Sequence, residues 1–358
     1  KQEMSGFGHA HEGSEHGHGH EKENGFNLRE VELFLTGEVD DLLIAEAVLA
    51  FSEDKTEVET AFVQTTSLPG GLALKGGKFF SGFGITNPQH PHQWSFADKP
   101  LIYELALGDH GLNEVGLQAT WQADVPFLLE IGMEALQGRN EAFFDYKNED
   151  LLPRHNGPRI GVGWLKLSPK TDLCHTVQFG LFGAGGVHQE IHEEEGPPAE
   201  TNHFDGVSWF AGADAFYHYN AHGNRGQGDL TLQAEYFYRK KELAPEGGTE
   251  KIKGTQDGYY CQVLYGFMPR WRGGLRWDQV GLINKIQEDG VKESFGDSWR
   301  GTAMVDFSSS QNSMIRFQIA GGDYETEEGA ERVWEGYLQF VLTLGSHGHH
   351  GEYVCFGH

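Results

Sequence analysis

Residues 229–240, DLTLQAEYFYRK, alternate between two kinds of side chain. Every second residue from Leu230 to Tyr238 is apolar or aromatic, whereas the residues between them are mostly polar and carry both charge signs. Successive side chains of a β-strand point to opposite faces, so the segment predicts a strand with one apolar and one polar face. This pattern alone fits a half-buried strand of a soluble protein or the wall of a membrane barrel.

The same period of two recurs along most of the chain. It is clear in residues 114–122, 127–135, 271–282 and 335–344, and helical periodicity is poor in comparable windows. Further segments begin near Val31, Leu43, Val58, Leu72, Val162, Leu173, Val207, Tyr259, Trp299 and Ile315. The total is about fifteen segments of roughly nine to thirteen residues, a length typical of transmembrane strands.

The connections between these segments alternate in length. Short turns such as residues 122–126 alternate with long polar connections. The long connections cover residues 84–113, 138–158, 185–205, 241–257 and 284–297. Outer-membrane barrels have short periplasmic turns and long extracellular loops, whereas a soluble all-β protein, the competing interpretation, has no reason to alternate in this way.

The sequence therefore predicts an all-β protein, a transmembrane antiparallel β-barrel of about 16 strands, with 14 as the alternative. Because such barrels have even strand numbers, one further strand is expected before Phe26, either upstream of Lys1 or overlooked. The loop lengths predict that the first recognisable strand starts outside and the last ends in the periplasm. Residues 1–25 form a His/Gly-rich segment predicted to be an extracellular loop, residues 26–346 the barrel, and residues 347–358 a His-rich tail.

Charge and composition narrow the function. The 358 residues include 27 basic and 53 acidic side chains, a net charge of -26. This balance excludes nucleic acid as a partner and favours cations. The three cysteines, Cys174, Cys261 and Cys355, predict no disulfide framework or metal motif. The sequence opens without an apolar signal region, so the protein is either cytosolic or has already lost a signal peptide.

Residues 68–108, LPGGLALKGGKFFSGFGITNPQHPHQWSFADKPLIYELALG, resemble a family of uncharacterised Gram-negative outer-membrane porins that is distantly similar to the phosphate-selective porins O and P. The resemblance implies an outer-membrane diffusion channel, trimeric or monomeric, without a plug domain. It also implies an early long loop that folds inward, which makes His90, His92, Trp94 and Asp98 candidates for the constriction; a rigid surface turn is the alternative. The acidic composition departs from phosphate-selective relatives, which select anions with Lys and Arg.

Charged residues on the polar parity of the strands are the predicted pore lining, because rings of charge set pore selectivity. They are Glu130, Glu134, Glu235, Arg239, Arg272, Arg276, Asp278, Arg300, Asp306 and Arg316. The arginines cluster in the last third of the chain, so an acidic wall is expected to face a basic one. The alternative is that these charges pair with one another and only solvate a polar lumen.

Histidine is the third candidate chemistry, because neutral imidazole binds Zn, Ni and Cu. The predicted metal ligands are His9, His11, His16, His18, His20, His188, His192, His347, His349 and His350. Flexible Gly/His tracts form no preorganised site, so the expected binding of Zn, Ni or Cu is weak. Ca at acidic loops is a further expectation, and no cofactor is required. A hydrated loop without metal is the alternative.

The predicted function is a porin for small hydrophilic solutes that prefers cations and is linked to transition-metal capture. A surface metal-binding protein without an open pore and an outer-membrane barrel enzyme are the alternatives. No nucleophile elbow, HExxH motif or phosphate-binding loop indicates an enzyme. The expected partners are outer-membrane lipid and lipopolysaccharide, small solutes or cations, further copies in a homotrimer, and other envelope proteins.

Overall fold

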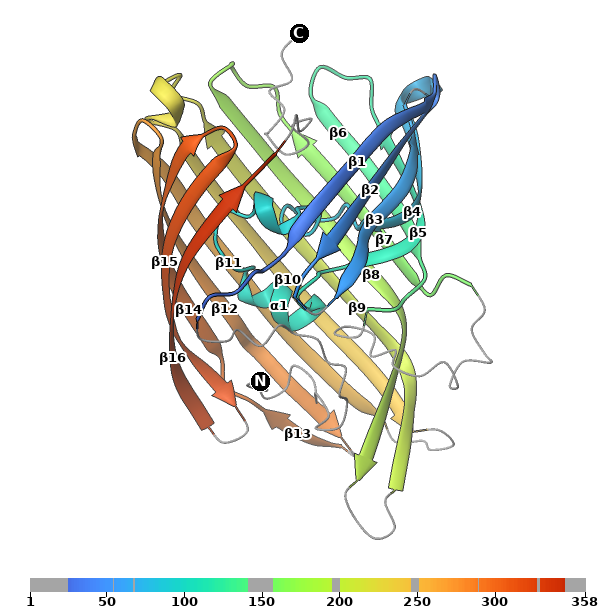
Figure 1. Cartoon of the computed structure of the whole chain (residues 1–358). Helices are drawn as coiled ribbons and strands as arrows, with labels where there is room; N and C mark the ends of the chain where they lie inside the picture. The colour runs from blue at the N-terminus through green and yellow to red at the C-terminus, as the bar shows by residue number, and fades with distance from the viewer. Residues whose placement is uncertain are drawn as a thin grey trace.

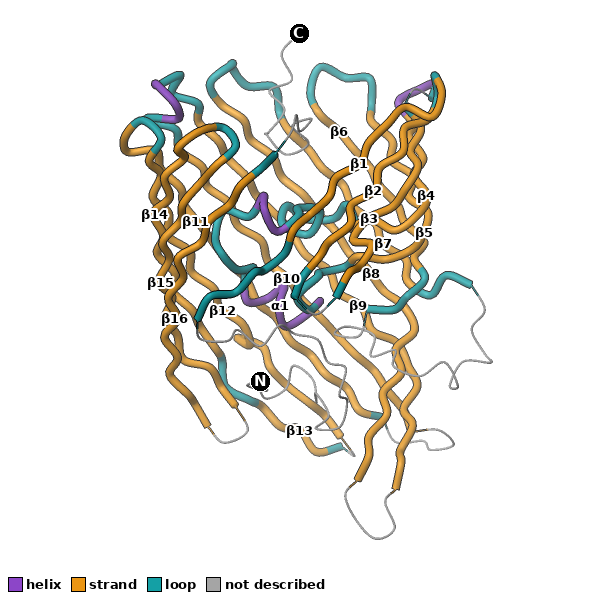
Figure 2. Tube along the Cα trace, in the orientation of Figure 1, coloured by secondary structure: helices purple, strands orange, loops and turns teal. Residues whose placement is uncertain are grey.

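The computed structural model describes residues 25–344 except 54, 67, 141–156, 195–199, 246–250, 289 and 327–328. Within this part of the chain, sixteen antiparallel strands form one sheet that curves into a barrel (Figures 1 and 2). Fifteen strands follow one another along the wall in chain order, and β13 pairs only with β12. The predicted all-β barrel is confirmed. Among the described helices, none has the length and apolar character needed to cross a membrane.

The strands are β1 (Val31–Asp40), β2 (Leu43–Phe51), β3 (Thr56–Thr65), β4 (Leu72–Phe80), β5 (Asn113–Gln122), β6 (Leu128–Leu136), β7 (Ile160–Ser168), β8 (His175–Glu194), β9 (Glu200–Tyr219), β10 (Leu230–Pro245), β11 (Ile252–Met268), β12 (Trp271–Glu288), β13 (Val291–Ser294), β14 (Ser298–Ser310), β15 (Ser313–Thr326) and β16 (Gly329–Leu342). One short α-helix, α1 (Leu101–Leu107), and three 3₁₀ turns, η1 (Pro69–Gly71), η2 (Pro91–Gln93) and η4 (Asn224–Gly226), lie in the described connections.

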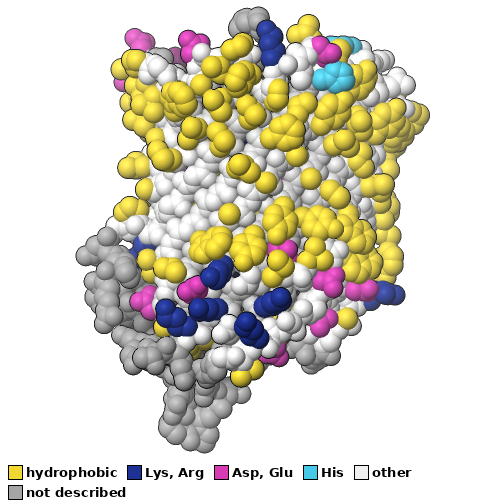
Figure 3. All heavy atoms as spheres, turned by 180° about the vertical axis from the view of Figure 1, so that it is seen from behind, with side chains coloured by type: hydrophobic (Ala, Val, Ile, Leu, Met, Phe, Trp, Pro, Cys, Tyr) yellow, Lys and Arg dark blue, Asp and Glu magenta, His cyan; other side chains and the backbone are white. Residues whose placement is uncertain are grey.

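The alternation in the sequence sorts side chains between the two surfaces of the wall. On β10, Leu232 is 41% exposed on the outer surface, whereas its neighbour Gln233 points inward and is 5% exposed. Leu275, Phe340 and Leu342 are also exposed on the outside, as their parity predicts. Figure 3 shows the apolar side chains spread over one face of the barrel, with charged side chains gathered near the long-loop end. The assignment of apolar faces to the outside is therefore confirmed.

Aromatic side chains mark two levels of the outer surface. Near the short turns, the rings of Trp271 and Phe307 lie 4.8 Å apart. Farther along the same two strands, Trp277 and Trp299 stack with their ring centroids 5.0 Å apart. Leu275 lies between these levels on β12. Rings at two separate heights are typical of the aromatic girdles at the two membrane interfaces.

The lengths of the connections separate the two ends of the barrel (Figure 1). Strand β1 runs toward the end with the short turns, as does β16, in agreement with the predicted topology. The predicted loop at residues 185–205 is wrong as a loop, because β8 continues to Glu194 and β9 starts at Glu200. The predicted loops at 241–257 and 284–297 are likewise shortened by β10 to β13. A strand that extends beyond the membrane can be polar on both faces, so apolar alternation stops before the strand does.

The wall has an odd number of strands in the described chain. Because every neighbouring pair is antiparallel, fifteen strands leave β1 and β16 running in the same direction. No ladder joins these two edges within the described residues. The further strand predicted before Phe26, either upstream of Lys1 or overlooked, stays a prediction. The predicted extracellular loop and the His-rich tail fall on residues 1–24 and 345–358, which are outside the described residues.

Candidate functional site

Residues 81–112, called the inner loop below, connect β4 to β5 and fold into the barrel (Figures 1 and 2). The inner loop contains η2 and α1, and α1 contacts β11 and β12 on the opposite wall. Near its start, Gly84 has a φ of +67°, and a Cβ there would lie 2.5 Å from a Glu235 carboxylate oxygen. A glycine is therefore needed where the loop turns inward against β10.

Glu235 on β10 holds the start of the inner loop. Its carboxylate accepts hydrogen bonds from the backbone N–H groups of Ile85 at 3.1 Å and Thr86 at 3.0 Å. It also accepts the hydroxyl of Tyr103, in α1, at 2.8 Å, and that of Tyr260. A buried carboxylate with four donors is satisfied, so Glu235 acts as an anchor rather than as a free charge in the pore.

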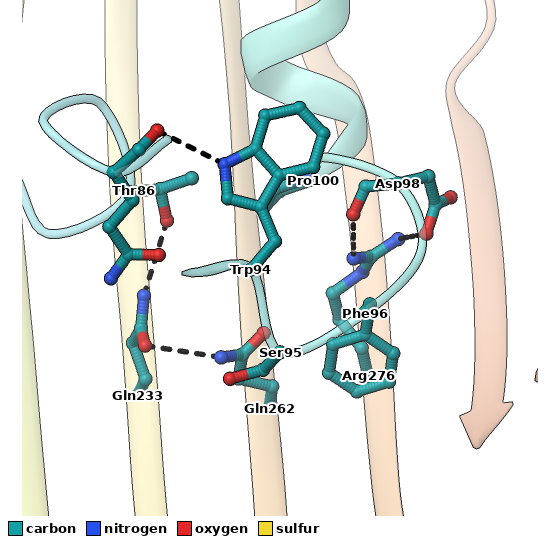
Figure 4. Close-up of a pocket in the computed structure, with 10 residues that line it drawn as sticks. Thr86, Trp94, Ser95, Phe96, Asp98, Pro100, Gln233, Gln262 and Arg276 are labelled. Atoms are coloured by element: carbon teal, nitrogen blue, oxygen red, sulfur yellow. Dashed lines mark hydrogen bonds and ion pairs between the residues drawn. The ribbon is translucent and has the colours of Figure 1, made fainter. Parts of the chain in front are cut away.

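Buried arginines of the far wall hold the middle of the inner loop. Asp98 pairs with Arg276 at 3.0 Å and with Arg300 at 2.9 Å. Asp278 pairs with the same two arginines and accepts the backbone N–H of Leu101 at 2.9 Å. Figure 4 shows Asp98 reaching Arg276 beside Phe96, with Trp94 and Pro100 above. The inner loop thus places the Asp98 carboxylate against the arginine-bearing wall and offsets the positive charge of that wall.

Two further contacts continue this attachment along the same wall. Arg316 on β15 donates to the backbone oxygen of Trp94 at 3.0 Å. The side chain of Gln318 accepts the backbone N–H of Ala97 at 2.8 Å and donates to Asp98 at 2.7 Å. The inner loop is therefore fixed at several points from β10 to β15.

An apolar cluster lies between the inner loop and the wall. The rings of Phe182, Phe210 and Phe237 have centroids 5.1 to 6.3 Å from that of Phe83 in the loop. All three wall residues point inward, so the polar parity of the strands is interrupted at this height. The sequence contained one indication of this, since Phe237 is the aromatic residue on the otherwise polar face of residues 229–240.

The opposite side of the inner loop faces β1 and β3 and carries histidine and glutamate. His90 Nδ1 lies 2.8 Å from Glu59 on β3, and His92 Nδ1 lies 2.9 Å from Glu32 on β1. Burial lowers the pKa of His90, but the hydrogen bond and charge of Glu59 outweigh it, so the pKa of His90 is raised. Burial, with the charge of Glu32 adding to it, raises the pKa of Glu30, in the coil before β1, to about 7.

The structure places the four constriction candidates inside the barrel. Trp94 and Asp98 are buried against the arginine wall, and His90 and His92 lie on the β1 side of the inner loop. Arg29, just before β1, reaches across to donate to the Ala97 backbone oxygen at 2.8 Å. The inner loop therefore lies between the acidic β1–β3 side and the arginine-bearing β12–β15 side.

The ten pore-lining candidates lie on the inward parity of their strands, but most are buried beneath or beside the inner loop. The Glu134 carboxylate accepts hydrogen bonds from the Ser81 hydroxyl, from the Gly82 N–H at 2.9 Å and from the Gln118 side-chain amide at 2.7 Å. Arg272 and Asp306 pair at 2.6 Å. Glu130 accepts the indole N–H of Trp164 at 2.9 Å, and Arg239 is buried on β10.

The metal candidates are dispersed. His188 is buried and lies 2.7 Å from the hydroxyl of Ser208, which is also buried. The side chain of His192 is outside the described residues. The other eight candidates, in residues 1–24 and 345–358, are also outside them. Sequence reasoning missed Glu32 and Glu59, because each is a single glutamate on a strand that only the fold brings to His90.

Comparison with known proteins supports the fold and a family relation. No family model matches the chain. An uncharacterized protein of Aquifex aeolicus (strain VF5) is 36% identical over 361 residues, covering 97% of this chain and 74% of that protein.

Two solved structures share the barrel. The outer membrane channel DcaP of Acinetobacter baumannii has a TM-score of 0.51 and 11% identity, covering 88% of this chain and 82% of that chain. A loop L8 deletion mutant of OmpT, an outer membrane protein of Vibrio cholerae, has a TM-score of 0.51 and 13% identity, covering 87% and 90%. The fold is that of an outer-membrane β-barrel. This fold confirms the outer-membrane location that the sequence predicted.

Proposed function

Because this chain belongs to the family of the Aquifex aeolicus protein and has an outer-membrane barrel fold, we propose that it is a porin-like diffusion channel for small hydrophilic solutes with a preference for cations. The observation that carries the proposal is the inner loop, which crosses a polar barrel interior and is fixed there by buried ion pairs. A loop placed in this way narrows the passage and determines which charged side chains face the passage.

The preference for cations follows from which charges are offset. Arg276 pairs with two carboxylates and Arg300 with three, so the charge of both arginines is neutralised. On the β1–β3 side, the carboxylates of Glu30, Glu32 and Glu57 are partly exposed, and each lies beside a basic side chain, Arg29, His92 and Lys55 respectively. Partly exposed carboxylates attract cations into the narrowed region. This charge distribution does not favour the anion selectivity of the phosphate-selective porins.

Metal capture by the terminal histidines, contact with lipopolysaccharide and assembly as a homotrimer belong to the same proposal. Several histidines close together in the sequence supply imidazole ligands for Zn, Ni or Cu. The exposed apolar belt suits outer-membrane lipid.

A barrel without an open pore is the second candidate function, and the apolar cluster around Phe83 favours it. Packing of α1 against the wall fills part of the interior with side chains that exclude water. A porin conducts, whereas a closed metal-binding barrel does not.

Planar-bilayer recordings of the purified full chain test the proposal. We expect stepwise current increases as channels insert. Glu57→Gln should lower the conductance for small cations, whereas Glu331→Gln, on the exposed end of β16, should leave it unchanged. Insertion without conductance would overturn the channel and support the closed barrel.

A further inference from the structure

Three side chains from separate parts of the chain converge on the β1 side of the inner loop. Glu32 comes from β1, Glu59 from β3 and His90 from the inner loop. One donor atom of each lies within 4.8 Å of the other two. Two carboxylates and one imidazole form the nitrogen and oxygen donor set that divalent first-row transition metals accept.

We propose that Glu32, Glu59 and His90 form a binding site for a divalent transition-metal cation inside the barrel. Metal–ligand bonds to imidazole and carboxylate are about 2.0–2.2 Å long, so donors on opposite sides of an ion lie about 4 Å apart. The three donor atoms lie within 4.8 Å of one another, so side-chain rotations can bring them to this spacing. His90 Nδ1 now contacts the Glu59 carboxylate at 2.8 Å, and the cation takes the place of the proton between them.

His92 is a positioning residue for this site. Its Nδ1 lies 2.9 Å from a Glu32 oxygen, and its ring stacks on that of His90 with centroids 5.7 Å apart. A hydrogen bond from a neighbouring side chain fixes the orientation of a ligating carboxylate. The ring edge of Phe80 closes another side of His90, with centroids 5.1 Å apart.

Burial indicates a site that is formed in advance but can be reached. The Glu59 side chain is only 3% exposed, which fixes its position, whereas the His92 side chain is 40% exposed. The arginine contacts on the far side of the inner loop hold His90 at this place. A cation in the barrel interior can therefore approach from the His92 side and meet preorganised ligands.

The location of the site in a conducting path rests on the proposed function, but binding itself does not. Calorimetry with Zn²⁺ therefore comes first, on full-length protein in which the nine histidines of residues 1–24 and 345–358 are replaced by Asn. We expect one Zn²⁺ per chain, with affinity on the order of 100-fold lower in His90→Asn and Glu59→Gln, and roughly 10–100-fold lower in His92→Asn.

Glu38→Gln is the matched control, because Glu38 lies on β1 with Glu32 but is six residues further along the strand and is exposed. It should change Zn²⁺ affinity far less than Glu59→Gln. Glu32→Gln serves as a second ligand variant if Glu59→Gln fails to fold. Equal Zn²⁺ binding in the parent and in the folded ligand variants would overturn the site.

Current block separates this proposal from the proposed function. In a conducting channel, Zn²⁺ should reduce the current of the parent protein but not of His90→Asn, and Mg²⁺ at the same concentration should have little effect. Absence of conductance with Zn²⁺ binding intact would refute the channel and leave the site. Conductance with no Zn²⁺ binding to the parent would refute the site and leave the channel.

Discussion

At the scale of single residues, the main feature of this molecule is its buried charges. Arg276 and Arg300 are almost fully excluded from solvent, where an unpaired charge is costly. Asp98 and Asp278 make that burial possible, and Asp98 also ties the wall to the inner loop. The arginines were predictable as inward-facing residues from parity alone. Their partner Asp98 was predictable only as a loop residue, because its pairing depends on how a loop of about thirty residues folds.

Asp98→Asn should release the inner loop. Removing one partner of a buried ion pair costs about 3–5 kcal/mol, because the remaining charges stay buried. We expect lower resistance to urea and a noisier, larger single-channel current. Asp323→Asn is the control, since Asp323 pairs with Arg332, whose side chain is 69% exposed. If the two variants behaved alike, Asp98 would not hold the loop.

The buried Lys99 is expected to make the free energy of unfolding depend on pH. Burial lowers its pKa to about 7, although Asp109 and Glu104 act to raise it, and Arg29 lowers it further. An unfolded lysine titrates near 10.4, so between about pH 7 and 10 the unfolded chain binds more protons. The contribution of Lys99 is therefore least favourable below pH 7, and stability rises with pH over this interval.

Lys99→Met should flatten this part of the pH profile, because the substitution removes the titrating group. Urea unfolding of the parent and the variant from pH 7 to pH 10 measures the difference in slope. Lys285→Met, at an exposed position on β12, should keep the parent slope. A Lys99→Met profile that is as steep as that of the parent would show that another group causes the slope.

Leu232 lies on the outer surface of the barrel, where a substituted side chain would face lipid. Arginine at the middle of the membrane costs about 2–4 kcal/mol. Leu232→Arg should therefore impair folding into lipid vesicles, whereas Thr231→Arg, on the inward parity, should fold nearly as well. Gln233 is a poor control, because it donates to Thr86 at 3.2 Å in a buried network. Equal folding yields for the two variants would contradict the assignment of inside and outside.

At the scale of elements, the strands were predictable and the inner loop was only partly so. Each of the fifteen wall strands contains a local period of two, which a single sequence displays, but β9, β11 and β16 start six or seven residues before the predicted segments. Helix α1 was not predicted, although Pro100 directly precedes LIYELAL. A helix of seven residues has little periodicity of its own, and packing of its apolar residues against the barrel stabilises it. The long strands β8 and β9 extend beyond the segments in which apolar and polar residues alternate.

The entry of the inner loop into the barrel depends on Gly84. Gly84→Ala combines a positive φ with a close approach to Glu235 and Tyr103, so it should destabilise the loop by at least about 1 kcal/mol. We expect faster cleavage by protease within residues 81–112 and a larger single-channel current. Gly37→Ala, on β1 with no atom within 4 Å of the added methyl group, is the matched control. Protease resistance equal to that of the control would show that the turn tolerates a side chain.

At the scale of the whole molecule, the barrel combines an apolar exterior, a polar wall and an inner loop that divides the charges inside. The described strands leave β1 and β16 as two edges with the same direction. The exterior and the wall could be predicted from the alternation in the sequence. The division of charge could not, because it depends on which carboxylates the loop carries to the arginines and which glutamates remain on the β1–β3 side.

The reversal potential of the purified protein in a salt gradient tests the central claim most directly. A channel whose arginines are neutralised by Asp98 and Asp278, with the carboxylates of the β1–β3 side facing the passage, should be more permeable to K⁺ than to Cl⁻. The reversal potential should move toward zero at high salt, because screening weakens the field of these carboxylates. A reversal potential of the sign expected for chloride permeation would contradict the account.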